Sequence, residues 1–328
     1  MDLLARHAQN PSAFLALNSD TRIFSVPGVD GAIAYRPAGR RFLIQFGGVF
    51  AAPSEQGILL REFLDFGRES KRRTIAVQLT PEDTRLYAEL DFTVNQFGSD
   101  YARRLDGFNV AGKKYVQLRN KVSRARREGL QVVEVGTDDV DAVDVTRLDQ
   151  QLDALDKSWL RAKGRYVREL AFMVGERDGA AAGLRRLFVA LKDGDPLAYV
   201  SFSPVYGERA GWLHDLSRRA PDAPPGALEL IVLTAVERFR AEGAAHLHFG
   251  FTPFVGLSQD HECAARSKLV SRVIRLIADH GTGIYPAATQ VAYKEKWGPD
   301  IIEPEYLAFQ GGVSVRAVWS LLRLTNIV

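Results

Sequence analysis

Residues 211–251 read GWLHDLSRRAPDAPPGALELIVLTAVERFRAEGAAHLHFGF, and this stretch predicts a strand, a loop, a helix and a second strand. The helix is expected over 226–242, because apolar residues recur there at the spacing of one helix face and Gly243 follows as a stop. The runs 211–216 and 246–251 are short and largely apolar, as strands are. The stretch therefore predicts a protein that combines a sheet with helices.

The same alternation extends over the rest of the 328 residues, a length that suits two domains. We place the boundary near residues 129–140, which gives an N-terminal part, 1–135, and a C-terminal part, 136–328. The expected fold class is α+β, with a mixed sheet flanked by helices in each part. Further strands are expected at 31–50 (two strands), 74–79, 92–97, 130–135, 187–191, 197–204 and 306–309, and further helices at 54–68, 113–128, 145–162, 267–278 and 315–324.

Composition limits the kind of protein and the kind of partner. Hydrophobic residues make up 46% of the chain and charged residues 25%, which is usual for a globular protein. The net charge of +3 argues only weakly for a polyanionic partner, so that case depends on local clusters. A single cysteine, Cys263, fits a reducing compartment, and neither a secretory signal nor a transmembrane segment is visible. We expect a cytoplasmic protein that at most sits on a membrane surface.

The densest cluster of positive charge lies at 113–127 and contains no acid. Like charges repel each other unless an anion is near, and a phosphate backbone suits them because each contact releases a counterion. A solvated helix face explains the cluster about as well. The cations are Lys113, Lys114, Arg119, Lys121, Arg124, Arg126 and Arg127.

The loop before the predicted helix contains Arg218, Arg219 and a Pro-Gly pair that ends at Gly226. The N-terminus of a helix presents free N–H groups and the positive end of its dipole, so it can hold a phosphate. The two arginines would strengthen such a site. A rigid surface turn is the simpler interpretation of the loop taken alone.

Two titratable residues, His214 and Asp215, precede Arg218 on the predicted strand. Regular alternation predicts that Trp212, His214 and Leu216 share one face and that Asp215 lies on the other. An Asp-x-x-Arg spacing at a strand end could orient an attacking group or supply a base. A structural ion pair between Asp215 and Arg218 is an equal alternative.

Lys294 and Lys296 flank a glutamate just before Trp297, near the end of the chain. Such lysines could hold a phosphate or stabilise negative charge on a carbonyl oxygen, and an exposed loop anchored by Trp297 is the alternative. The pair His246-x-His248 has no third ligand at a convincing spacing, so no metal site is expected. Motifs for dinucleotides, nucleoside triphosphates and hydrolase nucleophiles are absent from the sequence.

Taken together and in this order, these features resemble the C-terminal catalytic domain of bacterial phosphatidylglycerol lysyltransferases and their stand-alone relatives. The resemblance covers roughly residues 30–310 and rests on the ordered set rather than on one motif. The matching stretches are 117–129, 158–160, 214–218, 225–243, 248–253, 293–297 and 303–309.

The resemblance implies two tandem acetyltransferase-like (GNAT) halves, an aminoacyl-tRNA as donor and co-substrate, and no further cofactor. The acceptor would be a lipid head group or a small amine or hydroxyl compound, and peripheral contact with a membrane is compatible with it. In such a family the helix at 113–127 contacts tRNA, and Asp215, Arg218 and Lys296 line the transfer site.

From the implied reaction we expect Asp215, or His214 in its place, to act as base or orienting group. Lys296 is expected to bind the tRNA end or the developing negative charge. The residues expected to bind phosphate or substrate are Arg218, Arg219, Gly226 and Lys294.

Two departures from related proteins bear on the function. Coenzyme A-dependent enzymes of this fold carry a fuller glycine pattern in the loop before the helix than the Pro-rich loop here, and full-length lipid lysyltransferases carry a multi-helix membrane domain. The first departure favours a tRNA donor over coenzyme A. The alternatives are a coenzyme A-dependent N-acyltransferase, which would bind acetyl-CoA tightly, and a non-catalytic tRNA-binding module, which would leave the aminoacyl ester intact.

Overall fold

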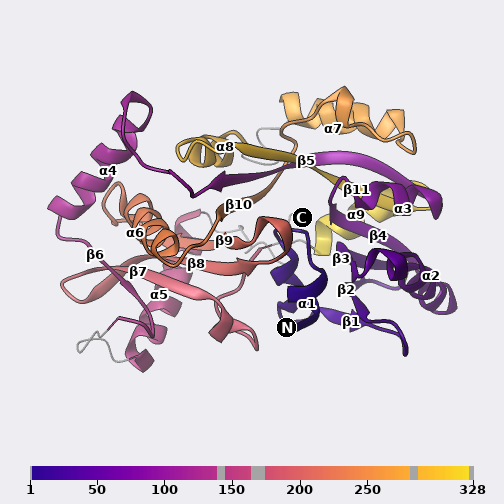
Figure 1. The fold of residues 1–328 in the computed structure, drawn as a ribbon, viewed down its shortest axis with the longest axis horizontal. Coiled ribbons are helices and arrows are strands. Elements are labelled where there is room, and N and C mark those ends of the chain that lie inside the picture. Colours follow the sequence, from indigo (N-terminus) through magenta and orange to yellow (C-terminus); the bar gives the residue numbers. More distant parts are fainter. Residues whose placement is uncertain (1, 139–144, 164–173, 281–286, 325–328) are drawn as a thin grey trace.

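A computed structural model describes residues 2–138, 145–163, 174–280 and 287–324. In these residues eleven strands form one mixed sheet, in the order β1-β2-β3-β4-β11-β5-β10-β9-β8-β7-β6, with helices on both faces (Figure 1). The strands are β1 (Arg22–Phe24), β2 (Gly31–Ala38), β3 (Phe42–Ala51), β4 (Arg73–Leu79), β5 (Phe92–Arg104), β6 (Gln131–Glu134), β7 (Arg186–Lys192), β8 (Asp195–Val205), β9 (Gly211–Arg219), β10 (His246–Pro253) and β11 (Ile301–Gln310).

The described helices include the predicted ones, with small shifts at their ends. The helix expected over 226–242 spans Ala227–Ala241, which confirms the prediction from its apolar spacing. The helices are α1 (Asp2–His7), α2 (Pro53–Glu69), α3 (Asp83–Glu89), α4 (Val116–Arg127), α5 (Val145–Lys163), α6 (Ala227–Ala241), α7 (Lys268–His280), α8 (Ala287–Glu295) and α9 (Val315–Leu324).

Each half of the sheet contains the same unit of three strands and a helix. Two antiparallel strands are followed by a helix and by a third strand that runs parallel to the second: β2, β3, α2 and β4 in one half, β8, β9, α6 and β10 in the other. Parallel neighbours need a long crossover connection, which α2 and α6 supply. The repeated unit agrees with the predicted α+β fold of two acetyltransferase-like halves.

The two halves share their central strands. β11 lies between β4 and β5 and is antiparallel to both, and β5 pairs in turn with β10. A strand from the C-terminal part therefore completes the sheet of the N-terminal part. The division into 1–135 and 136–328 stays a prediction, and the hydrogen-bonded sheet runs across it.

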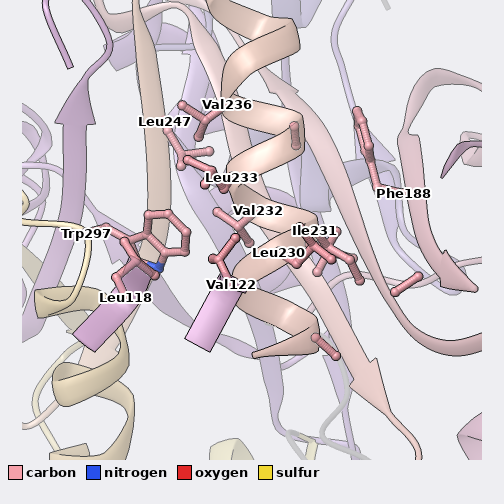
Figure 2. Close-up of a cluster of buried hydrophobic side chains, with 14 of the residues drawn as sticks. Leu118, Val122, Phe188, Leu230, Ile231, Val232, Leu233, Val236, Leu247 and Trp297 are labelled. Atoms are coloured by element: carbon pink, nitrogen blue, oxygen red, sulfur yellow. The ribbon is translucent and has the colours of Figure 1, made fainter. Parts of the chain in front are cut away.

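The largest apolar core lies where α4 and α6 pack together over β7–β10 (Figure 2). α4 contributes Leu118 and Val122, α6 contributes a row that includes Ile231 and Val232, and Trp297 closes one side. On the other face of the same strands, α5 packs over alternate side chains in a separate cluster. The core therefore fixes the basic helix α4 directly against α6.

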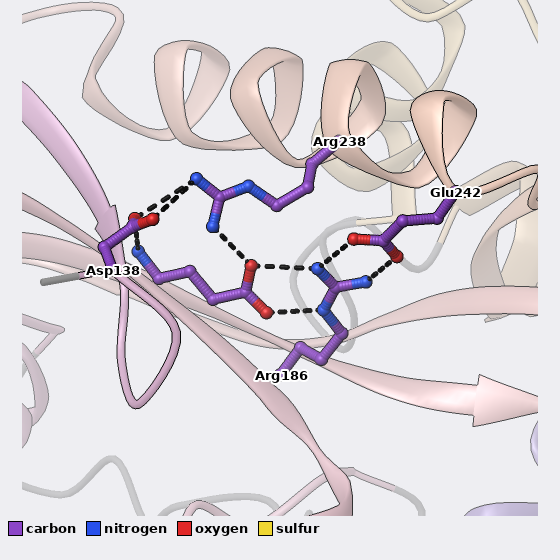
Figure 3. A network of polar contacts seen from close by, with 5 residues as sticks. Asp138, Arg186, Arg238 and Glu242 are labelled. Carbon is purple, nitrogen blue, oxygen red and sulfur yellow. Dashed lines mark hydrogen bonds and ion pairs between the residues drawn. The ribbon is translucent and has the colours of Figure 1, made fainter.

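A network of charged side chains ties the far end of α6 to the edge of the sheet (Figure 3). Glu134 on β6 accepts hydrogen bonds from Arg186 at 2.5 and 2.8 Å and from Arg238 at 2.6 Å. Arg186 also binds Glu242, and Arg238 also binds Asp138. Burial alone would raise the pKa of Glu134, but the two guanidinium groups outweigh it and lower the pKa. The network therefore stabilises the fold at neutral pH, and this contribution is lost as the pH falls through the lowered pKa of Glu134.

Candidate functional site

β9 and β10 run in parallel over three residue pairs and then part. Residues 211–213 pair with residues 246–248. Beyond these pairs β9 continues along β8 and β10 continues along β5, and each strand has an irregular register at this point. The side chains that follow on the two strands therefore surround the place where the sheet divides.

A β-bulge at Asp215 decides which face of the sheet the next residues meet. The pairing with β8 skips Asp215 between His214 and Leu216. Trp212 and His214 face the aromatic rings under α6, whereas Leu216 packs in the cluster under α5. The prediction that Leu216 shares a face with Trp212 and His214 is therefore wrong, because the extra residue shifts the alternation by one.

Asp215 is buried as a side chain and forms an ion pair with a residue that the sequence did not single out. Its Oδ2 accepts a hydrogen bond from Nε of Arg185 at 3.2 Å, and Arg185 also donates to Asn18 at 2.6 Å. Burial raises the pKa of Asp215 to about 6, although Arg185 acts in the opposite direction. A carboxyl group that titrates near neutral pH is suited to accept a proton from a hydroxyl group.

The two predicted arginines at the end of β9 have different surroundings. Arg218 is buried on the α5 side, with its guanidinium 4.0 Å from the ring centre of Trp159 and its Nε 3.8 Å from Oδ1 of Asp156. Arg219 is exposed at the end of the strand. Both stay predicted substrate-binding residues, Arg218 as a charge fixed in the wall and Arg219 as a charge at the surface.

His214 is a partly buried, neutral imidazole. Burial lowers the pKa of His214 to about 4, and the positive charge of Lys294 adds to this effect. Its ring lies 5.7 Å from the ring of Tyr293 on α8, and its Nε2 has no hydrogen-bond partner among the described residues. A neutral imidazole with an unoccupied ring nitrogen can form one hydrogen bond to a substrate.

Lys294 lies in the last turn of α8 with a buried side chain, so the alternative of an exposed loop is wrong for this residue. Its Nζ donates to the carbonyl oxygen of Gly250 and, at 2.6 Å, to Oγ1 of Thr252, both on β10. Burial lowers the pKa of Lys294 to about 8, while nearby carboxyl groups act in the opposite direction. The ammonium group can donate three hydrogen bonds, and the two on β10 fix its position.

Two buried carboxyl groups on the central strands accompany Lys294, and sequence reasoning missed both. They are Asp100 on β5 and Glu305 on β11. Burial and the neighbouring Asp100 raise the pKa of Glu305 well above its usual range, whereas Lys294 acts in the opposite direction. Burial therefore favours the uncharged form of Glu305. No sequence motif could have predicted that these two residues lie close together, because β5 and β11 are far apart in the sequence and become neighbours only in the sheet.

The entrance of α6 packs directly against α4. A Cβ at Gly226 would collide with the carbonyl oxygen of Lys121, and the backbone of Gly226 has a φ of 97°. In the first turn of α6, Oε1 of Glu229 lies 3.1 Å from Nζ of Lys121 and 3.3 Å from Nζ of Lys296. The basic helix α4 and the Pro-Gly loop that begins α6 therefore lie side by side. This is necessary if both are to bind one ligand.

The cations of 113–127 divide into two groups. Some hold the local structure, and others are exposed on α4 and on the turn before it. The cations that form hydrogen bonds or ion pairs with other described residues are Arg119, Lys121 and Arg124. The exposed ones outside this group are Lys113, Lys114, Arg126 and Arg127.

Substituting Gly226 by alanine should separate the two helices. We expect a loss of about 4 kcal/mol in the free energy of unfolding, because overpacking and a left-handed alanine each cost about 1–3 kcal/mol. Gly243, at the other end of α6, has a φ of 83°, and a Cβ there would meet no described atom within 4 Å. Gly243→Ala should therefore cost only about 1 kcal/mol. Urea unfolding of both variants measures the difference, and equal losses would contradict the close packing at Gly226.

Comparison with known proteins shows that the chain is similar to phosphatidylglycerol lysyltransferases. The family model "Phosphatidylglycerol lysyltransferase, C-terminal" matches residues 1–309. The phosphatidylglycerol lysyltransferase of Bacillus subtilis (strain 168) is 23% identical over 319 residues, which is 95% of this chain and 35% of that protein. The chain thus spans about a third of the length of that relative.

Two solved structures have the same fold over nearly the whole chain. One is the C-terminal domain from Agrobacterium fabrum that is named after a lysylphosphatidylglycerol synthetase, with 23% identity, a TM-score of 0.77 and coverage of 99% of this chain and 93% of that one. The other is L-PGS from Bacillus licheniformis, with 22% identity, a TM-score of 0.77 and coverage of 99% and 94%. These likenesses confirm the predicted α+β fold.

Proposed function

Because the chain belongs to the family of phosphatidylglycerol lysyltransferase C-terminal domains, we propose that it transfers an aminoacyl group from tRNA to a hydroxyl group of a lipid head group. The observation that carries the proposal is the contact between α4 and the entrance of α6 beside the divided sheet. The groups that the reaction would need lie on elements around it: exposed cations on α4, the buried carboxyl group of Asp215 on β9, and the buried lysine Lys294 on α8 beside β10.

The exposed cations of α4 suit the phosphates of a tRNA. Arg126 and Arg127 lie in the last turn of the helix and are exposed, so a phosphate backbone could approach them without disturbing the core. Lys121 and Lys296 reach the same side from α4 and from the end of α8. The tRNA end would then lie near the place where β9 and β10 part.

Glu229 argues against coenzyme A at the entrance of α6. In that position of the fold a helix N-terminus would hold a pyrophosphate. Burial would raise the pKa of Glu229, but Lys121 and Lys296 outweigh it and lower the pKa, so the carboxyl group is ionised. A carboxylate already occupies the favourable end of the helix dipole and would repel a pyrophosphate.

The transfer exchanges one ester for another and needs a proton acceptor and a group that stabilises negative charge. The acceptor hydroxyl oxygen bonds to the ester carbonyl carbon while its proton passes to Asp215. Negative charge then develops on the former carbonyl oxygen, where Lys294 supplies an ammonium group and His214 a hydrogen bond. The bond to the ribose oxygen breaks, this oxygen takes the proton, and tRNA leaves with its hydroxyl group restored.

The proposal is tested by incubating the chain with a set of charged tRNAs, lysyl-tRNA first, and vesicles that contain phosphatidylglycerol. We expect an aminoacylated lipid, detected by mass spectrometry, that depends on the charged tRNA. Product from an acyl-CoA in place of tRNA would support the N-acyltransferase instead. Binding of tRNA without loss of the ester would support the non-catalytic module.

Reversing two exposed charges on α4 should weaken tRNA binding without disturbing the fold. We expect Arg126→Glu combined with Arg127→Glu to lower the affinity for tRNA at least about tenfold and to reduce the slope of log K against log salt by about two. Filter binding over a salt series measures both quantities. The matched control reverses Arg61 on α2 and Arg85 on α3, which are also exposed. Equal losses in both double variants would show that only net charge matters and would contradict a specific role of α4.

A further inference from the structure

α7 is an amphipathic helix that turns its apolar side outward. Leu269, Val273 and Leu276 recur at helical spacing and are exposed by 70%, 49% and 64%. Ile274 is the buried residue of the helix. A helix of a globular core shows the reverse arrangement, with its apolar row inside.

Basic residues flank this apolar row. Lys268 and Arg272 are exposed next to it. Arg275 lies closer to the protein, where its Nη2 is 2.6 Å from Oε1 of Glu262. An apolar row bordered by cations matches the surface of an anionic lipid bilayer, in which acyl chains lie beneath negatively charged head groups.

α7 is anchored to the strand that also carries part of the candidate site. Nδ2 of Asn95 on β5 donates to the carbonyl oxygen of Ser267 at 3.0 Å and to Oγ of Ser271 at 2.9 Å. Asp100, beside Lys294, lies five residues further along β5, which corresponds to about 17 Å of strand. Figure 1 shows α7 at the rim of the molecule beside β5, and α8 follows it in sequence.

We propose that α7 lies on the surface of an anionic phospholipid bilayer and thereby holds the lipid head groups near the site at Lys294. This inference rests on the proposed lipid acceptor and identifies the surface that meets it. α9 also exposes apolar residues, including Trp319, but it packs on the far half of the sheet with α1, β2 and β3. A membrane held there would be several strands away from the place where β9 and β10 part.

Sedimentation with vesicles tests the surface without tRNA. We expect the unaltered chain to bind vesicles of phosphatidylglycerol and phosphatidylcholine more tightly than vesicles of phosphatidylcholine alone. Val273→Ser combined with Leu276→Ser should weaken binding to the mixed vesicles at least about tenfold, and Arg272→Glu should weaken it mainly through charge. The matched control, Val318→Ser combined with Trp319→Ser on α9, should bind within about twofold of the unaltered chain. Unchanged binding of the α7 variants, a loss confined to the α9 variant, or no vesicle binding by the unaltered chain would each overturn the proposal.

Transfer assays separate this inference from the proposed function. With a short-chain, water-soluble phosphatidylglycerol as acceptor, the α7 double variant should keep the kcat/KM of the unaltered chain, because its transfer site is intact. With vesicles as acceptor it should lose activity together with vesicle binding. If vesicle binding depends on α7 but no aminoacyl group is transferred to either acceptor, the membrane-binding role of α7 is supported and the proposed function is contradicted.

Discussion

Replacing Asp215 by asparagine is expected to lower the rate of aminoacyl transfer at least about 100-fold, since a positioned general base contributes about 10²–10⁴-fold. Asparagine keeps the size of the side chain but cannot accept the proton of the acceptor hydroxyl. A single-turnover assay with labelled aminoacyl-tRNA measures the chemical step directly. Glu176, whose charge acts on Asp215 and whose Oε1 accepts a hydrogen bond from the backbone N–H of Ser19 at 2.8 Å, offers a control: Glu176→Gln should change the rate only a few-fold.

The pH dependence distinguishes a base from a residue that merely supports the fold. Because burial raises the pKa of Asp215 to about 6, the rate should fall as the pH drops through about 6 and level off above it. Asp215→Glu should retain this fall in rate at low pH, although with a lower maximal rate, and Asp215→Asn should lose the pH dependence. If the asparagine variant keeps both the rate and its pH dependence, Asp215 is not the base.

The raised pKa of Asp215 also has a consequence for stability. A carboxyl group whose pKa is higher in the folded chain favours folding at low pH, and this contribution is lost as the pH rises through the folded value, here about 6. Ionised Asp215 therefore costs folding free energy at neutral pH, which Arg185 offsets only in part. A buried group kept ionised against that cost is typical of a functional site.

Sequence patterns predicted the parts of the structure that depend on residues close together in the chain. The spacing of apolar residues located α6 within one residue at each end, and the charge pattern located the helix that packs beside it. Both features are properties of a single helix, which periodicity reports directly. The sequence assigned both the helix at 113–127 and the loop before α6 to substrate binding, and the close approach of Gly226 to the carbonyl oxygen of Lys121 shows that the two lie side by side.

Contacts between distant strands were beyond the reach of such patterns. The face of Leu216 was mispredicted because a β-bulge has no reliable signal in sequence, and one extra residue reverses a period of two. Arg185, Asp100 and Glu305 reach the site only because β7, β5 and β11 are assembled into one sheet. The carboxyl groups of Asp100 and Glu305 could therefore not be assigned to the site until the order of the strands was known.

The structure also separates the two lysines that the sequence treated together. Lys296 is partly exposed and is paired with Glu229, at the side where the cations of α4 gather. Lys294 is buried, held by β10, and close enough to His214 to lower its pKa. We therefore propose that Lys296 binds the end of the tRNA and that Lys294 stabilises the negative charge that develops during transfer.

Substituting Lys294 by methionine should therefore reduce transfer by about 10²–10³-fold, the effect of removing one donor to an oxyanion, mainly in kcat. Lys296→Met should act mainly on KM for the charged tRNA, with a loss of about tenfold, or roughly 1.4 kcal/mol. Methionine removes the charge and keeps most of the length of each side chain, and Glu305→Gln serves as a control of the buried cluster. Burial raises the pKa of Glu305 well above its usual range and so favours its uncharged form, which is why its amide should keep the activity within a few-fold. Urea unfolding shows whether Lys294→Met folds. If it folds and still transfers at the original rate, the developing negative charge is stabilised by another group, and Lys296 would take the role proposed here for Lys294.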